Sequence, residues 1–317
     1  EIKLRNAEDI YTIIYNHQIP PGSSDVVHYE FALTDGDIDD YVIRAELNYR
    51  KFDSYYAGKS LPESHYNNLP ITTIATDEID FSRLNLPYKT DTEMAKRLND
   101  YGVALLRKPG KSHFKQAESA FMKVATYENE QGSLNLLRLY YKDGQLEKAR
   151  SLLKNIRLEK LNNPWTVEWY AALLNADYGN LEEALNSLTR LYETDWASAR
   201  ERGFDFSYDI RLINKIAEVY FLQSRIAMGD EQNRLVKVAK TFYKRALQVD
   251  PEDLTAHFGL SKIAQVQDDP SSEMYHAEHY FTYKPDEEAL SSVSKLARIS
   301  NNSLDQKANP TAIYKLK

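Results

Sequence analysis

Two histidines within one turn of a predicted helix are the residues best placed to ligate a metal. His276 and His279 lie three residues apart, and Glu273 precedes His276 by the same spacing. On a helix this spacing brings the three side chains to one face, where they could bind a divalent cation or a haem iron. Tyr275 and other aromatic residues share the segment, so a histidine pair without a ligand is the alternative.

Two further histidines and an acidic cluster are weaker candidates for ligand or metal binding. His17, between predicted strands, and His65, in a long loop, could each ligate the cofactor of a partner protein. Asp37, Asp39 and Asp40 follow a glycine, but the closing glutamate of a calcium-binding loop is missing, so a turn between strands explains them better. We expect no metal site in this chain, with His276, His279 and His17 as the candidates that could overturn this expectation.

The composition excludes several classes of chemistry. Without cysteine, the chain has no thiolate nucleophile, no disulfide, no zinc–cysteine site and no covalent haem attachment. It also lacks a glycine-rich phosphate loop and a nucleophile elbow. The net charge is −7, with acidic and basic residues interspersed, which is untypical of nucleic-acid binding. No apolar run reaches the roughly 20 residues that span a bilayer. We therefore expect a protein that is not an enzyme and holds no cofactor itself.

The spacing of apolar residues differs between two parts of the chain, and so does the secondary structure expected to position these histidines. From about residue 91 the apolar positions follow a helical period, and small residues spaced ahead of large apolar ones mark a longer repeat. The small residues are Ala117, Ala149, Ala184 and Ala239, and the first two separations are 32 and 35 residues. These values bracket the 34 residues of a tetratricopeptide repeat, and Pro251 stands where the last repeat requires its helix-stopping proline.

The third separation, of 55 residues, indicates an insertion near 193–210, with the polar stretch 229–234 as a further part. A fifth unit is predicted from Leu254, with its second helix at about 271–283. A polar helix from 286 to 298 would then form a solubilising cap. We predict a repeat domain of about five helix pairs over residues 89–300 and a C-terminal tail over 301–317.

Residues 1–88 alternate with period two instead. Runs of β-branched and aromatic residues at 10–15, 26–31, 41–49 and 71–76 are separated by turn residues. They predict an antiparallel, β-sandwich-like domain packed on one face. Because so few strands leave unpaired edges, further strands from upstream or from another chain would complete the sheet. The predicted fold class is α+β, an N-terminal antiparallel β domain followed by an all-α tetratricopeptide superhelix.

Partner-binding residues of such arrays point from the first helix of each repeat into the concave face. The predicted register places there Asn99, Leu134, Arg138, Tyr141, Trp169, Leu173, Phe221 and Phe258. The set is aromatic and apolar with few charges, which favours a packed peptide, helix or protein edge over a basic carboxylate clamp, with Trp169 and Tyr141 as anchors. The alternative is that some of these side chains fill the interior of the superhelix.

Short motifs run through both parts of the chain: YNHQIPPG at 15–22, LNYRKFD at 47–53, LPITTIA at 69–75, PWTV at 164–167 and RGFDFS at 202–207. This series resembles the C-terminal region of bacterial multihaem c-type cytochromes, in which a β domain precedes tetratricopeptide repeats. Those proteins are exported and carry C-x-x-C-H haem sites in an N-terminal region. Since this chain has no such motif, no haem-binding residue is carried over.

The resemblance implies a partner rather than an activity. We expect a non-catalytic scaffold that docks to multihaem c-type cytochromes or organises them, in the periplasm or outside the cell, with a homo-oligomer or filament as a possible assembly. Haem c would belong to the partner or to a region upstream of Glu1, which is no translation start and indicates a processed form or a fragment. The alternative is an assembly adaptor of an envelope or secretion complex, unrelated to haem.

Overall fold

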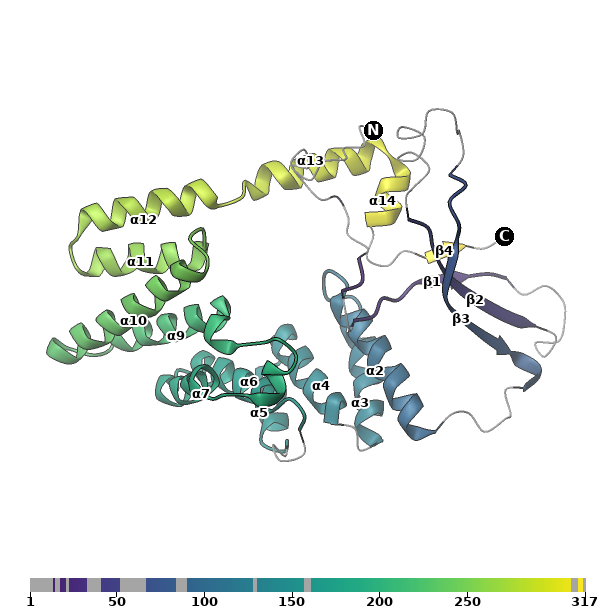
Figure 1. The fold of residues 1–317 in the computed structure, drawn as a ribbon, viewed down its shortest axis with the longest axis horizontal. Coiled ribbons are helices and arrows are strands. Elements are labelled where there is room, and N and C mark those ends of the chain that lie inside the picture. The colour runs from purple at the N-terminus through teal and green to yellow at the C-terminus, as the bar shows by residue number, and fades with distance from the viewer. Residues whose placement is uncertain are drawn as a thin grey trace. The chain divides into compact units, whose positions relative to one another are not determined.

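The chain divides into a helical unit, Glu1–Val27 with Asp91–Ala312, and a small β unit, His28–Thr90 with Ile313–Lys317 (Figure 1). These limits differ from the predicted ranges 1–88 and 89–300, because residues before the first strand belong with the helices. The computed structural model describes residues 14, 18–20, 23–32, 41–51, 67–83, 90–127, 130–156, 161–308 and 313–315.

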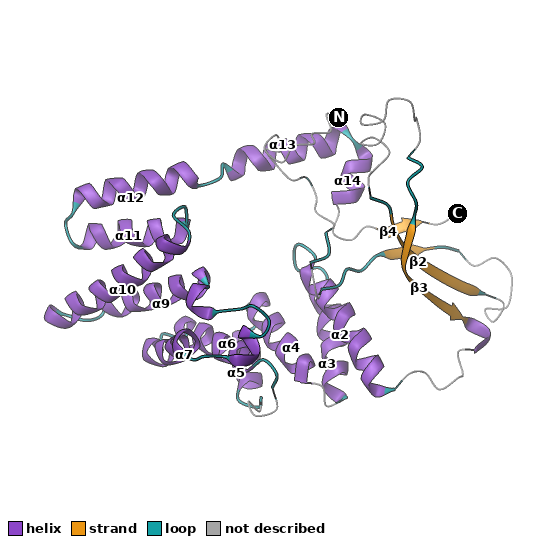
Figure 2. Cartoon of the chain, in the orientation of Figure 1, coloured by secondary structure: helices purple, strands orange, loops and turns teal. Residues whose placement is uncertain are grey.

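The helical unit is a series of helix pairs (Figure 2). The first helices of the pairs are α2 (Asp91–Arg107), α4 (Glu130–Asp143), α6 (Pro164–Asp177), α9 (Ile210–Ser224) and α11 (Leu254–Val266). The second helices are α3 (Phe114–Thr126), α5 (Leu146–Leu153), α7 (Leu181–Glu193), α10 (Gly229–Val249) and α12 (Pro270–Tyr283). Each packs on its partner, and successive pairs touch, for instance α4 with α6 and α9 with α11. The predicted five pairs of a tetratricopeptide-like array are present in the described residues.

Small residues let the two helices of a pair approach closely. Ala117, Ala149, Ala184 and Ala239, which mark the repeat in the sequence, are each fully buried. Between successive pairs, Gly259 of α11 does the same, since a Cβ atom there would lie 2.2 Å from the Tyr243 ring of α10 in the fourth pair. The cores are local clusters shared by neighbouring pairs, which is how a repeat array buries its apolar faces.

Turn residues end the first helices where the sequence predicts turns. Gly144 after α4 and Gly179 after α6 each have a φ of +80°, a left-handed conformation that glycine adopts without a Cβ penalty. Pro251 follows the end of α10 at Val249, and Pro164 opens α6. Both prolines stand where a missing backbone N–H costs no helical hydrogen bond.

The insertion lies between α7 and α9, as predicted, and contains the short helix α8 (Ala197–Arg200) and the 3₁₀ turn η5 (Phe206–Tyr208). The stretch 229–234, predicted as part of the insertion, instead forms the first turns of α10. Asp230 and Glu231 favour this start because acidic side chains stabilise the N-terminus of a helix.

The C-terminal helices are α13 (Glu287–Ser300) and α14 (Asn302–Ala308), so the predicted tail is helical at its start. The prediction of a polar cap at 286–298 is wrong, because Val293, Leu296 and Ile299 of α13 are 51%, 67% and 73% exposed. A solubilising cap needs a polar outer face, and α13 presents apolar side chains instead.

Described residues before the first strand contact the C-terminal end of α2. The Arg107 guanidinium donates to the carbonyl oxygens of Ser24 (2.7 Å) and Gln18 (3.1 Å), and Lys108 pairs with Asp25 at 2.7 Å. Val26 packs on the cluster that α2, α3 and α4 share. These contacts explain why this segment belongs to the helical unit.

The β unit contains two separate pairs of strands. β2 (Val42–Tyr49) and β3 (Thr72–Asp80) form an antiparallel ladder with an irregularity between Leu47 and Asn48. β1 (His28–Glu30) pairs in parallel with β4 (Ile313–Lys315), and the turn η3 (Phe81–Arg83) follows β3. The antiparallel prediction is therefore confirmed for 41–49 with 71–76 and wrong for 26–31. The predicted strand at 10–15 lies, except for Ile14, outside the described residues.

The one-face packing predicted for the sheet is absent from the described strands. Val42, Leu47, Tyr49 and Ile74 are all more than half exposed. A two-stranded ribbon has no second layer on which to bury a face, so the alternating pattern by itself does not produce a β-sandwich. None of the helices in the described ranges is both long and apolar enough to cross a membrane.

Gly259→Ala is expected to lower the free energy of unfolding by about 1–3 kcal/mol, because the new methyl group overlaps the buried Tyr243 ring. This loss outweighs the helix-propensity gain of up to about 1 kcal/mol. Urea unfolding followed by circular dichroism measures the change. Adding Tyr243→Leu to Gly259→Ala should restore part of the lost stability. Ser119→Ala, on the exposed surface of α3, should change the free energy of unfolding little. A neutral Gly259→Ala variant would contradict the close approach.

Candidate partner-binding cavity

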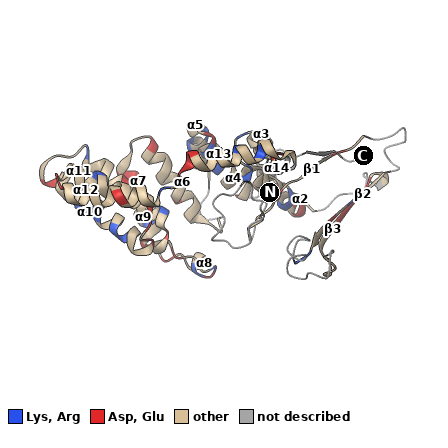
Figure 3. Cartoon of the chain, turned by 90° about the horizontal axis from the view of Figure 1, so that it is seen from above, with Lys and Arg blue, Asp and Glu red and all other residues tan. Residues whose placement is uncertain are grey.

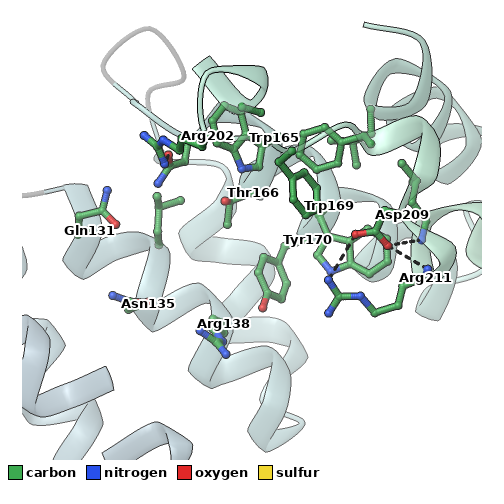
Figure 4. A pocket seen from close by; sticks show the side chains of 17 residues that line it. Gln131, Asn135, Arg138, Trp165, Thr166, Trp169, Tyr170, Arg202, Asp209 and Arg211 are labelled. Carbon is green, nitrogen blue, oxygen red and sulfur yellow. Dashed lines mark hydrogen bonds and ion pairs between the residues drawn. The ribbon is translucent and has the colours of Figure 1, made fainter. Parts of the chain in front are cut away.

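A cavity of about 580 Å³ opens between the first helices α4, α6 and α9 and the insertion (Figure 4). The lining residues come from four segments of the helical unit: Gln131, Leu134, Asn135 and Arg138; Asn163, Trp165, Thr166, Trp169 and Tyr170; Leu191, Ala199, Arg202, Phe204 and Phe206; Asp209, Arg211 and Leu212. The site therefore needs the second, third and fourth repeats and the insertion between the last two, and no single repeat provides it.

Three of the eight predicted partner-binding residues line this cavity. Leu134 is almost fully buried, Trp169 is partly buried, and Arg138 is exposed at the rim. Tyr141, the second predicted anchor, lies beside the cavity and not in its lining. Its ring packs against Tyr170, with centroids 5.6 Å apart, and burial together with a hydrogen bond to Asp177 raises its pKa. Tyr141 thus supports a lining residue.

The remaining predicted residues are divided among other roles. Asn99 accepts a hydrogen bond from the Asn135 amide at 2.8 Å, between the first helices α2 and α4. Leu173 is buried and Phe221 packs against the core of the fourth and fifth pairs, so both fill the interior of the array. Phe258 is 48% exposed on α11 of the fifth pair and does not line the cavity. His17 lies outside the described residues.

The insertion is fixed to the array by an aromatic cluster. The Trp196 indole N–H donates to the Leu191 carbonyl at 3.2 Å, at the end of α7. Trp165 of α6 packs edge-on against Trp196 and tilted against Phe206, with centroids about 6 Å apart in both pairs. Phe204 lies 4.8 Å from Phe206, centroid to centroid. These contacts turn the inserted loop into one wall of the cavity.

Three arginines from different elements reach the lining. The Arg202 guanidinium lies 5.7 Å above the Trp165 ring and donates to Oδ1 of Asn163 at 3.0 Å. Arg211 is highly exposed, and Nη2 of its guanidinium lies 3.4 Å from Oδ2 of Asp209. Burial raises the pKa of Tyr170, while the positive charges of Arg138 and Arg211 oppose the rise, which places both charges near this phenol.

The cavity is electropositive although the chain as a whole is acidic. Asp209 is the one carboxylate among the lining residues, and it caps α9 by accepting from the backbone N–H groups of Arg211 (2.9 Å) and Leu212 (3.1 Å). Basic and acidic side chains are otherwise interspersed along the helices (Figure 3). The lining holds no histidine and no second carboxylate.

Sequence reasoning missed Trp165, Arg202, Phe204, Phe206 and Arg211. The signal available was the pair of motifs PWTV and RGFDFS, which contain four of these residues. Neither motif indicates that the insertion folds back over α6. The predicted partner-binding set contains only one of the three cavity arginines, Arg138, because Arg202 and Arg211 are not at the positions that the repeat register selects.

The histidine pair predicted on α12 packs against a third, buried histidine, His257 of α11. Nε2 of His257 lies 3.0 Å from the Pro251 carbonyl oxygen, which can only accept, so this nitrogen carries the proton. Nδ1 of His257 is then the acceptor for the Nδ1–H of His276, at 3.1 Å. His279 stacks on His257, with ring centroids 5.0 Å apart, and donates from Nδ1 to the Tyr275 carbonyl.

These imidazoles join the two helices of the last pair. In the part of the chain that the structure describes, no group of three or more histidine, aspartate or glutamate side chains is arranged to hold a metal ion. Both ring nitrogens of His257 are engaged in hydrogen bonds, so a metal would have to displace one of them.

No protein-family model and no curated protein matches the sequence. Among solved structures, a double mutant of MamA RS-1 aligns with 60% of this chain and 94% of its own, at 13% identity and a TM-score of 0.45. MamA from Desulfovibrio magneticus RS-1, from residue 41 to its end, aligns with 63% and 97%, at 15% identity and a TM-score of 0.43. A monomeric IFIT1 mutant with Gppp-AAAA aligns with 65% and 54%, at 16% identity and a TM-score of 0.40. Each TM-score is below 0.5, so these likenesses do not indicate a function for this chain.

The helical unit is expected to lose stability as the pH falls from about 6.5 to 4. Burial first, and then the charges of His257, His279, Lys240 and Lys244, lower the pKa of His276 from 6.5 to about 4. Between these values the unfolded chain binds the proton and the folded chain does not, so acid favours unfolding. Because the ring is partly exposed, we expect a loss of roughly 1–2 kcal/mol.

Urea unfolding at several pH values tests this expectation against the variant His276→Asn. Asparagine keeps a side-chain N–H donor near His257 but does not titrate. Carboxylates that titrate in the same range are common to both proteins and cancel in the difference. The wild type should therefore lose more stability than the variant between pH 6.5 and 4. Parallel curves for the two proteins would show that His276 does not contribute.

Proposed function

We propose that this chain is a non-catalytic scaffold whose helical array binds a segment of a partner protein in the cavity between α4, α6 and α9. The observation that carries the proposal is the composition of this cavity. It lies on successive first helices, the surface with which repeat arrays of this kind bind partners, and it exposes aromatic and arginine side chains together. Tryptophan, tyrosine and arginine are the residues that most often dominate binding energy at protein interfaces.

The cavity is built for a chain segment and not for a flat surface. About 580 Å³ of space bounded by Trp165, Trp169 and Phe206 can enclose side chains of an inserted peptide. Tyr141 and the Trp196 contact with Leu191 hold the walls before a partner arrives. A wall that is ordered in advance reduces the entropy cost of binding.

The partner that we propose is a multihaem c-type cytochrome, in the periplasm or outside the cell. The support is the series of motifs that resembles the C-terminal region of such cytochromes. One of these motifs, RGFDFS at 202–207, supplies Arg202, Phe204 and Phe206 to the cavity wall. On this proposal the haem belongs to the partner or to a region upstream of this chain, because a chain without cysteine cannot attach haem c covalently.

Trp169→Ala is expected to weaken partner binding by about 2 kcal/mol or more, since it removes the central aromatic wall of the cavity. The measurement is affinity capture of tagged protein from the native source, followed by a haem absorption spectrum and haem staining of the eluate. The wild type should retain a haem protein and the variant should lose it. Phe281→Ala, an exposed aromatic residue of α12 outside the cavity, is the matched control.

Different outcomes separate the two parts of this proposal. Capture of a protein without haem that depends on Trp169 would keep the scaffold and exclude the cytochrome, as expected of an envelope or secretion adaptor. Equal capture by the wild type and Trp169→Ala, with the variant still folded by circular dichroism, would exclude the cavity as the partner site.

A further inference from the structure

Three arginines from three separate elements line one cavity. Arg138 comes from α4, Arg202 from the insertion and Arg211 from the first turn of α9 (Figure 4). The single lining carboxylate, Asp209, is already used by two backbone N–H groups at the start of α9. In a chain of net charge −7, this gathering of positive charge is a local feature and does not follow from composition.

We propose that the cavity binds an acidic segment of the partner, an extended peptide with at least two carboxylates and an apolar or aromatic side chain between them. This inference rests on the proposed scaffold function and specifies the chemistry of its partner. Arginine is the side chain best suited to it, because the planar guanidinium matches a carboxylate with two parallel hydrogen bonds.

Arg202 and Arg211 have weaker carboxylate contacts than two arginines of the same unit outside the cavity. Arg190 pairs with Glu168 at 2.7 Å, and Arg234 pairs with Glu231 at 2.7 Å. By contrast, Arg202 donates to a neutral amide, and Arg211 approaches its carboxylate only at 3.4 Å with 83% of its side chain exposed. A carboxylate entering the cavity could therefore be bound without first breaking a strong ion pair.

The N-terminal turn of α6 adds to the positive potential. Asn163 stands at its N-cap position but makes no capping hydrogen bond from its side chain, and its Oδ1 accepts from Arg202 instead. Trp165 and Thr166 of this first turn line the cavity. The partial positive charge at a helix N-terminus favours an anionic group in the same place as Arg202.

Aromatic side chains distinguish a peptide from a small anion. Trp165, Trp169, Tyr170, Phe204 and Phe206 form the apolar part of the lining. A free phosphate or carboxylate would leave this surface in water, whereas an apolar side chain of a peptide would cover it. Each aromatic residue that the peptide covers adds contact area between its two carboxylates. The cavity therefore favours a peptide that has both the carboxylates and the apolar side chain.

A nucleic acid is the less favoured ligand. Its backbone carries a negative charge at every nucleotide, and proteins that bind nucleic acids have a broad basic surface that matches it. Here acidic and basic residues alternate along the helices outside the cavity (Figure 3), so an extended phosphate chain would meet carboxylates beyond the three arginines. A short acidic peptide is confined to the cavity and avoids this repulsion.

Selection from a random octapeptide library on the whole chain tests the inference. We expect the recovered peptides to carry two or more Asp or Glu residues with an apolar residue between them. The triple variant Arg138→Gln, Arg202→Gln, Arg211→Gln should recover none of these peptides. Enrichment of neutral or basic peptides by the wild type, or recovery of the same acidic peptides by the triple variant, would overturn it.

Titration of one selected peptide by fluorescence anisotropy then assigns the contacts. Each single glutamine variant should weaken binding about fivefold or more, and replacing the peptide's glutamates by glutamine should weaken it similarly. Arg234→Gln, an arginine of α10 outside the cavity, is the matched control and should leave the affinity unchanged. Complete competition by a single-stranded oligonucleotide at equal concentration would assign the cavity to nucleic acid and overturn the proposal.

This test can fail independently of the scaffold function. If Trp169→Ala abolishes partner capture while the triple glutamine variant captures the partner normally, the scaffold function stands and the acidic segment is excluded. If neither variant affects capture and no peptide is enriched, both proposals fail together.

Discussion

The close approach of neighbouring helices, within a pair and between successive pairs, is the constraint on which the rest of the helical unit depends. It is possible only where one helix presents a small residue, such as Ala184 or Gly259, to a large one on its neighbour. Side chains as large as Tyr243 then pack against the backbone of the facing helix. Each pair buries its apolar face on the next, so the array extends by repetition of one contact.

The cavity arises where this repetition is interrupted. A regular repeat would pack the fourth pair directly after the third, but the insertion between α7 and α9 supplies Arg202, Phe204 and Phe206 to a new wall. The wall stays in place because Trp196 donates a hydrogen bond to the end of α7 and packs edge-on against Trp165. Interruption of a repeat thus creates a site that the repeat itself does not contain, with positive charge and aromatic surface in one place.

The histidine cluster shows how the same residues support two interpretations until their neighbours are known. Spacing on α12 allows His276 and His279 to ligate a metal, but the decisive partner is His257 on α11, about twenty residues earlier in the sequence. Its carbonyl contact with Pro251 fixes which nitrogen carries the proton. The imidazoles are then explained as contacts between helices, at a cost in stability when the solution becomes acidic.

The sequence by itself determined the repeat register, the buried alanines, the turn glycines and the position of the insertion, because each follows from local period and residue size. It also marked the strands at 41–49 and 71–76. Tertiary structure decided which predicted binding residues face open space, since Leu173 and Trp169 share a helix yet one is core and the other lines the cavity. It also decided that β1 pairs with β4 from the other end of the chain. Contacts between residues far apart in sequence leave no local pattern, so the arginine cavity could not be read from spacing alone.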